Sequence, residues 1–309
     1  MVRGGRQDVI AAPNGSPPAA GARSEVTTDP LSFGLAIACL IIVSVNLRPG
    51  IVSVGPLLPD IQRAFGLSHT SVSLLIAIPD VLMGALALPA PWIARRFGRD
   101  RVILGALLLL LGSTIMRAIA GSPAGLLVAT AGVGAGIAVA GALMASFVKA
   151  RFPGKTSIAL GLYAACLGVG STLAAALTGP LAEWAQNWRV GAGAWAVPCI
   201  LAVAAWVIVD RQGQASGSER TATVHHRLPF AIPVVWFIGG YFAFNNFIFY
   251  ALLAALVPIY NEQGLSITQA GFVLAALAGG ATVGSIFFGL LSRAGSIGEA
   301  IWRRAPDWF

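Results

Sequence analysis

The run SFGLAIACLIIVSVNLRPGIVSVGPLL, residues 32–58, is long and apolar enough to cross a membrane as a helix. A span needs about 20 mostly apolar residues to cross the hydrocarbon core. This one carries Asn46, Arg48 and Pro49 at its centre. A charge at that depth costs about 2.5–3.5 kcal/mol on insertion scales. We therefore expect Arg48 to face a polar cavity or a partner side chain and not the lipid.

The rest of the chain has the same membrane character. Of its 309 residues, 57% are hydrophobic and 10% are charged, and the mean hydropathy is +0.80. A soluble domain carries about 25% charged residues. We predict an all-α polytopic membrane helix bundle and a multi-pass protein of the lipid bilayer. The eight predicted spans are 32–58, 70–93, 102–120, 123–148, 156–181, 189–209, 231–258 and 267–291.

The distribution of basic residues predicts the orientation. The net charge of +8 comes from Lys and Arg in short clusters between the apolar runs, a pattern that sets topology and gives no reason to expect nucleic acid. With both termini in the cytoplasm, the cytoplasmic side receives most of the positive charge, as the positive-inside rule requires. We expect a plasma (inner) membrane protein. The cytoplasmic basic residues are Arg3, Arg6, Arg23, Arg95, Arg96, Arg99, Arg101, Lys149, Arg151, Lys155, Arg211, Arg220, Arg227, Arg293, Arg303 and Arg304.

Composition divides the chain into five segments. Residues 1–30 are rich in Pro, Gly, Ala and Ser and are predicted to be a disordered cytoplasmic tail. Residues 31–209 hold six spans, residues 210–230 form a polar cytoplasmic linker, and residues 231–291 hold two more spans. Residues 292–309 turn polar again.

An internal repeat relates the first two spans to the last two. LLPDIQRAFGLSHTSVSLL (57–75) and LVPIYNEQGLSITQAGFVL (256–274) share a Leu/Val-Pro step, a short polar link, Gly-Leu-Ser, and a Thr that opens a new apolar run. Six spans separate their starts, so both copies have the same orientation. Parallel halves of this kind are one of the known transporter plans.

No residue pattern indicates an enzyme or a bound cofactor. The three cysteines lie inside apolar runs at unrelated spacings, which gives no metal site and predicts buried thiols. Neither a nucleophile–base set nor a Walker-type phosphate loop is visible in the sequence. We therefore expect no metal and no ATP-driven step.

Specific motifs resemble those of the major facilitator superfamily. The loop PWIARRFGRDR resembles the signature G-x-L-a-D-R-x-G-R-R of that family through Arg96, Gly98, Arg99 and Arg101, although Arg95 replaces the usual Asp. Gly179-Pro180 resembles the end of its G-x-x-x-G-P-type motif. NLRPGIVSVGPLLPDI, GLYAACLGVGSTLAAALTGPLAEW and FIFYALLAALVPIYNEQGLS resemble the cyanate/2-nitroimidazole branch.

The resemblance implies a secondary transporter of a small anionic or nitrogenous solute, with the signature loop in gating and protons as candidate coupling ions. It also implies MFS-type parallel six-helix repeats with twelve spans, whereas this sequence provides eight. The second half is then incomplete, and we expect an interrupted gene.

Arg48 and Asp80 are the charged candidates for the site. Counted from the outer ends of their spans, Arg48 is about 13 Å deep and Asp80 about 15 Å at 1.5 Å per residue. In one interpretation Arg48 binds substrate beside Asn46, and Asp80 orients Arg48 or carries a proton. In the other, Arg48 and Asp80 form a permanent ion pair in a truncated membrane fragment that does not transport.

The seventh span supplies further polar candidates. Asn245, Asn246 and Tyr250 lie in YFAFNNFIFY, on a helix that lines the central cavity in the resembled family. They are predicted to bind substrate opposite Arg48, or alternatively to form bonds between helices.

Two further expectations concern residues without a predicted role in transport. Arg117, near the outer end of the third span, is expected to extend to the membrane interface. Gly132 and Gly136, and likewise Gly280 and Gly284, are expected to allow close helix packing.

Overall fold

The computed structural model describes residues 33–215 and 233–293, and these residues form helices joined by short turns, with no strand among them. The first half contains α1 (Phe33–Leu47), α2 (Pro49–Val52), α3 (Val54–Phe65), α4 (His69–Ala87), α5 (Ala90–Phe97) and α6 (Arg99–Ile119). It continues with α7 (Pro123–Arg151), α8 (Thr156–Trp184), α9 (Trp188–Gly193) and α10 (Ala196–Ala215). The last two helices are α11 (Pro233–Glu262) and α12 (Ile267–Arg293).

Eight helical stretches of the described ranges are long and apolar enough to cross a membrane, which confirms the predicted number of spans. Two of these stretches are broken: α1–α3 form one span over Phe33–Phe65, and α9–α10 form another over Trp188–Gln212. The predicted tail 1–30 lies outside the described residues, as do most of the linker 210–230 and of the segment 292–309. Helix α10 reaches Ala215, so the segment predicted as linker begins inside a helix.

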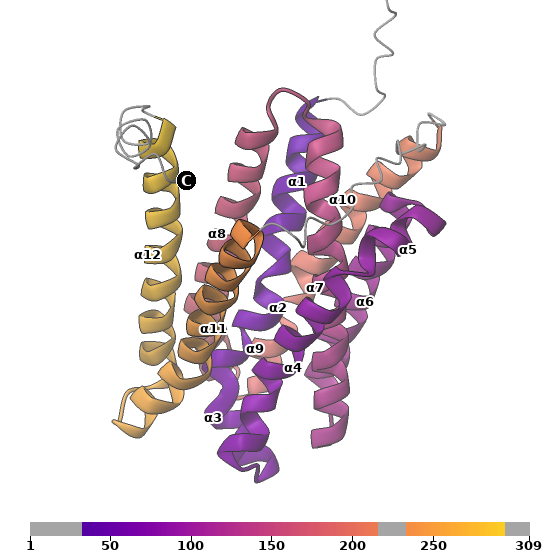
Figure 1. Cartoon of the computed structure of the whole chain (residues 1–309). Helices are drawn as coiled ribbons and strands as arrows, with labels where there is room; N and C mark the ends of the chain where they lie inside the picture. Colours follow the sequence, from indigo (N-terminus) through magenta and orange to yellow (C-terminus); the bar gives the residue numbers. More distant parts are fainter. Residues whose placement is uncertain (1–32, 216–232, 294–309) are drawn as a thin grey trace, which may run out of the picture.

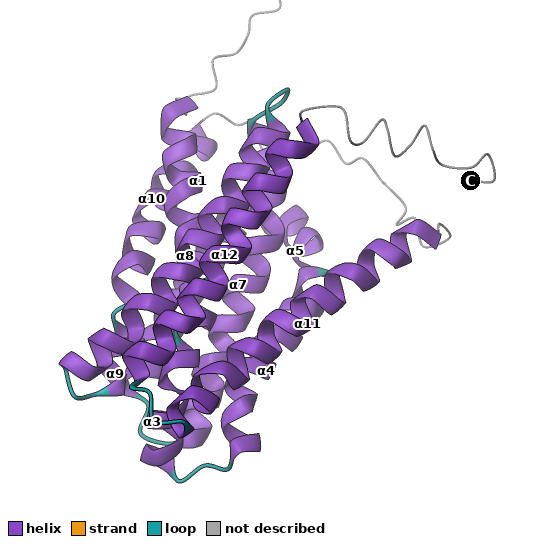
Figure 2. Cartoon of the chain, turned by 90° about the vertical axis from the view of Figure 1, so that its left-hand side faces the viewer, coloured by secondary structure: helices purple, strands orange, loops and turns teal. Residues whose placement is uncertain are grey.

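Helices α1–α10 form one bundle, and α11 and α12 lie against it through different neighbours. Helix α12 runs beside α8 (Figure 1), whereas α11 leans away from the bundle at its Pro233 end (Figure 2) and packs through its other end on α3 and α4. The core of the first bundle includes Phe147 and Trp206, whose ring centroids are 5.0 Å apart.

The two copies of the sequence repeat fold in the same way. A glycine with positive φ follows each first helix: Gly66 comes directly after α3, and Gly264 lies two residues beyond Glu262, the end of α11. The next residue then donates its backbone N–H five residues back, from Leu67 to Gln62 over 3.1 Å and from Leu265 to Tyr260 over 3.1 Å. The serine that follows caps the next helix in both copies. The shared Gly-Leu-Ser therefore builds one turn twice, because only glycine adopts this left-handed backbone without strain.

Glycines pack α7 tightly against its neighbours. A Cβ atom at Gly132 would lie 2.2 Å from Ser113 Oγ, and one at Gly136 would lie 2.8 Å from the Ala106 carbonyl oxygen. The expectation of close packing is confirmed for these two glycines. It is wrong for Gly280 and Gly284, where an added Cβ would meet no described atom within 4 Å.

Candidate functional site

The first span breaks where the sequence places Arg48. Helix α1 ends at Leu47, the one-turn helix α2 begins at Pro49, and α3 begins after Ser53. Pro49 has no N–H to donate to the preceding turn, and proline rings distort a helix at that point. The Arg48 carbonyl accepts the N–H groups of both Ile51 and Val52, each over 3.1 Å. Arg48 (φ −82°, ψ −36°) and Ser53 (φ −62°, ψ −20°) keep helical backbone angles, so the break is a local distortion within one continuous span.

Arg48 contacts the second half of the chain. Its Nη1 donates a hydrogen bond to the Tyr250 hydroxyl over 3.0 Å. Its guanidinium carbon lies 5.9 Å from the ring centroid of Phe249. Arg48 is half-buried and Tyr250 is buried, and the Tyr250 hydroxyl also lies 3.7 Å from Met83 Sδ on α4. Helices α2, α4 and α11 therefore meet around one guanidinium.

The direct ion pair expected between Arg48 and Asp80 is not present. Within the described ranges neither Arg48 nor Asp80 takes part in an ion pair, whereas Arg63–Asp60 and Arg99–Asp100 do pair. Asp80 is near enough for Coulombic interaction with Arg48 but not for contact. The Arg48 guanidinium donates to the Tyr250 hydroxyl on α11 instead. Arg48 and Asp80 therefore lie near each other but do not form a bonded ion pair.

The asparagines predicted for the site lie apart from Arg48. Asn46 is 2% exposed, its amide nitrogen and oxygen have no hydrogen-bond partner among the residues that the structure describes, and it lies near the Cys199 thiol on α10. Two residues along a helix correspond to about 200° around its axis, which separates Asn46 from Arg48. On α11, Asn245 is exposed and Asn246 is half-buried. Of the candidates on α11, Tyr250 is the one brought into contact with Arg48.

Arg117 contradicts the expectation that it would extend to the interface. It is 1% exposed, and its Nη1 donates to the Gly50 carbonyl over 2.7 Å while its Nη2 donates to Ser53 Oγ over 3.2 Å. The physical reason is that the broken first span presents backbone and hydroxyl acceptors beside α6. The signal in the sequence was a charged residue inside an apolar run. Arg117 was interpreted as an interfacial residue because it lies near the end of the helix.

The predicted gating loop forms the short turn between α5 and α6. Gly98 has a φ of +88°, which allows the sharp turn. Arg99 Nε pairs with Asp100 Oδ1 over 3.0 Å, and its guanidinium carbon lies 5.4 Å from the Phe147 ring centroid. Arg96 and Arg101 are exposed. Asp100, which sequence comparison with the signature did not single out, thus provides a carboxylate within this loop.

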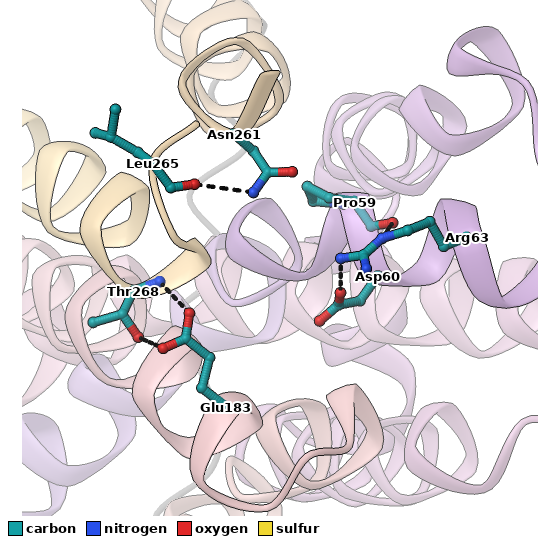
Figure 3. A network of polar contacts seen from close by, with 7 residues as sticks. All are labelled: Pro59, Asp60, Arg63, Glu183, Asn261, Leu265 and Thr268. Carbon is teal, nitrogen blue, oxygen red and sulfur yellow. Dashed lines mark hydrogen bonds and ion pairs between the residues drawn. The ribbon is translucent and has the colours of Figure 1, made fainter. Parts of the chain in front are cut away.

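A second polar contact joins α8 to α12 at the opposite end of the bundle. Glu183 Oε1 accepts the backbone N–H of Thr268 over 3.0 Å, and Glu183 Oε2 accepts the Thr268 hydroxyl over 2.6 Å (Figure 3). The carboxylate therefore sits at the first turn of α12, where unpaired N–H groups favour a negative charge. Glu183 was given no role from the sequence, and this contact, which is made from the last turn of α8, was missed.

Helices of spanning length, a charged residue inside the first span and contacts between two repeat units are features of a polytopic membrane protein built from repeats. The chain belongs to the Major Facilitator Superfamily, whose family model matches residues 31–304.

Curated relatives lie within that family. The cyanate transport protein CynX of Escherichia coli K12 is 34% identical over 254 residues, covering 82% of this chain and 66% of the relative. The 2-nitroimidazole transporter of the same organism is 28% identical over 235 residues, covering 76% of this chain and 60% of the relative. The chain thus spans about 60 to 66% of the length of these relatives.

Solved structures agree on the fold. A bacterial homolog of the human lysosomal transporter Spinster, in an inward-facing and occupied conformation, superposes with a TM-score of 0.70 at 23% identity. That match covers 87% of this chain and 63% of the solved one. A peptide transporter in complex with sulfate gives a TM-score of 0.53 at 20% identity, covering 72% and 46% of the two chains.

Proposed function

We propose that this protein acts as a secondary transporter of a small anionic or nitrogenous solute, cyanate-like or nitroimidazole-like, by alternating access. The observation that carries the proposal is the contact of Arg48 with Tyr250 across the two repeat units. A guanidinium presents a planar set of donors that suits small planar anions. Its lack of a bonded carboxylate in the described ranges leaves its charge available to such a solute.

The proposed substrate site is centred on Arg48 and Tyr250, with Phe249 as an apolar wall. Asp80 is proposed to orient Arg48 through space or to take up a proton during transport. Asn245 and Asn246 are proposed to contact the solute in another conformation of α11. Asn46, which is buried inside the first bundle, is proposed to take part in substrate binding from there.

We assign both termini to the cytoplasm and the protein to the plasma membrane, following its basic loops. In this orientation the α5–α6 loop with Arg96, Gly98, Arg99 and Arg101 lies on the cytoplasmic side. The Glu183–Thr268 contact then lies on the outer side and closes it. The relatives' transport activity supports this proposal, although the chain spans only part of their length.

The test is uptake of labelled cyanate, nitrate and 2-nitroimidazole into proteoliposomes that contain the purified protein. Arg48→Ala should abolish uptake while the protein still inserts and keeps its melting temperature. Arg48→Lys, which keeps the charge but loses the planar set of donors, should retain partial uptake. Arg63→Ala, at the exposed end of α3, is the matched control and should leave uptake unchanged.

Two results would contradict the proposal. Normal uptake by Arg48→Ala would remove Arg48 from the substrate site. A wild-type protein that inserts but takes up none of these solutes would fit the alternative of a membrane protein without transport activity.

A further inference from the structure

The break in the first span is held from α6 by a residue outside the proposed site. Arg117 reaches across to the Gly50 carbonyl at 2.7 Å and to Ser53 Oγ at 3.2 Å; Gly50 lies within the one-turn helix α2 that follows Arg48, and Ser53 directly follows that helix. A guanidinium can bind two acceptors at once in fixed geometry. Arg117 therefore fixes both the position and the rotation of this stretch.

The same stretch is also held from α7. A Cβ atom at Gly50 would lie 2.9 Å from Val133 Cγ1 and 3.1 Å from Ile137 Cδ1. Gly50 is thus packed closely against two apolar side chains of α7, and its carbonyl accepts the hydrogen bond from Arg117 on α6. Backbone held on both sides in this way cannot rotate without losing one set of contacts.

Arg117 has no counter-charge of its own. Its side chain is buried, and no carboxylate forms an ion pair with it in the part of the chain that the structure describes. Burying a cation is costly unless it is hydrogen-bonded. Among the described residues the Gly50 carbonyl and the Ser53 hydroxyl compensate the two terminal nitrogens, while Nε has no partner, so the burial of the Arg117 charge depends on the shape of the break.

We infer that Arg117 is a positioning residue for Arg48. By fixing Gly50 and Ser53, it holds the backbone that carries Arg48 so that the Arg48 guanidinium meets Tyr250. The part of this inference that concerns solute affinity rests on the proposed function; the part that concerns the Arg48–Tyr250 contact does not.

The experiment reads out Tyr250 directly. The protein is labelled with 3-fluorotyrosine, and the ¹⁹F resonances of its four tyrosines are assigned by Tyr→Phe variants. Arg48→Met, which lacks the donor, defines the Tyr250 resonance without the hydrogen bond. Arg117→Lys keeps the charge but cannot bind both acceptors in the same geometry. It should move the Tyr250 resonance toward the Arg48→Met position and leave the Tyr260 resonance in place.

A matched control separates positioning from general packing. Like Arg117, Arg189 donates to a backbone carbonyl, that of Ala120 over 2.9 Å, but Arg189 is only half-buried and does not touch the break. Arg189→Lys should leave the Tyr250 resonance unchanged. Ser53→Ala removes one of the two acceptors of Arg117 and should displace the resonance in the same direction by a smaller amount, which provides a test even if Arg117→Lys does not fold.

Uptake measurements extend the test to transport. Arg117→Lys should raise the half-saturation concentration by about tenfold, which corresponds to the loss of one well-placed interaction, with a nearly unchanged maximal rate. A Tyr250 resonance at its wild-type position in folded Arg117→Lys and Ser53→Ala proteins would overturn the inference. If the resonance moves as expected but no variant or wild-type protein takes up solute, the inference stands and the proposed function fails.

Discussion

Arg48 and Tyr250, 202 residues apart in the sequence, are joined by a 3.0 Å hydrogen bond between the first span and the first helix of the second repeat unit. This bond connects the two units whose relative movement alternating access requires. Because the donor is charged, the bond is stronger than one between neutral groups. A solute that competes for the guanidinium would weaken the bond, which links solute binding to the contact between the units.

The Tyr250 hydroxyl provides the first prediction. Tyr250→Phe removes the acceptor of Arg48 and keeps the ring. A hydrogen bond to a charged group contributes about 1.5–3 kcal/mol. We expect solute affinity to change by about tenfold or more, measured as the half-saturation concentration for uptake. Tyr260→Phe on the same helix is the control, and an equal effect of both variants would contradict a specific role for Tyr250.

A second prediction concerns the packing of α8 against the break in the first span. A Cβ atom at Gly170 would lie 2.1 Å from the Val45 carbonyl oxygen, which is the carbonyl four residues before Pro49. Gly170→Ala should therefore push α8 away from α1 and lower the melting temperature, since overpacking costs about 1–3 kcal/mol.

Gly161 on the same helix is the control for this substitution. An added Cβ there would meet no described atom within 4 Å. Gly161→Ala should stabilise the helix by about 0.5–1 kcal/mol because alanine restricts the unfolded chain more than glycine does. Equal melting temperatures for the two variants would contradict the close approach of α8 to α1.

The sequence was sufficient to predict the spans and the repeat, because both depend on local patterns. Apolar length defines a span, and the repeated Gly-Leu-Ser carries the turn residues themselves. A distortion at Pro49 was also predictable in kind, since proline removes a helical hydrogen bond. That it interrupts the helix there was not predictable, because Pro59, Pro79, Pro180 and Pro258 lie inside helices that continue.

The contacts between distant helices could not be predicted in the same way. Arg117 and Arg48 both lie in apolar runs, but which acceptors they meet depends on how α6 and α11 rotate against the first span. The pairing of Arg48 with Asp80 was a reasonable expectation from equal depth, and it was wrong because depth does not fix the direction of a side chain. Glu183 gave no signal beyond its place at the end of an apolar run.

A third prediction concerns the loop between α5 and α6. Asp100→Asn removes the carboxylate that pairs with Arg99 over 3.0 Å and keeps the size of the side chain. We expect the maximal uptake rate to fall several-fold with little change in the half-saturation concentration, because the loop lies far along α5 and α6 from Arg48. Arg95→Gln, which changes an exposed arginine of the same loop, should have a much smaller effect. A change in affinity without a change in rate would argue against gating by this pair.

The contact of Glu183 with Thr268 gives the last prediction. The carboxylate binds the first turn of α12 through two hydrogen bonds, and α8 and α12 belong to different repeat units (Figure 3). If this contact closes the outer side, breaking it should favour opening there. Glu183→Gln removes the charge, and Thr268→Val removes the hydroxyl donor with nearly the same shape. Each substitution should lower the stability of the closed state by about 1–3 kcal/mol.

Opening can be measured as the rate at which a membrane-impermeant maleimide labels a cysteine introduced at Ala175, which is buried near α12. Both variants should raise this rate, by about tenfold for a loss of 1.4 kcal/mol. Glu262→Gln, at the exposed end of α11, is the control and should leave the rate unchanged. Glu183→Gln and Thr268→Val could instead be labelled as slowly as the parent protein. That result would mean that packing between α8 and α12 holds the outer side closed and that this contact does not.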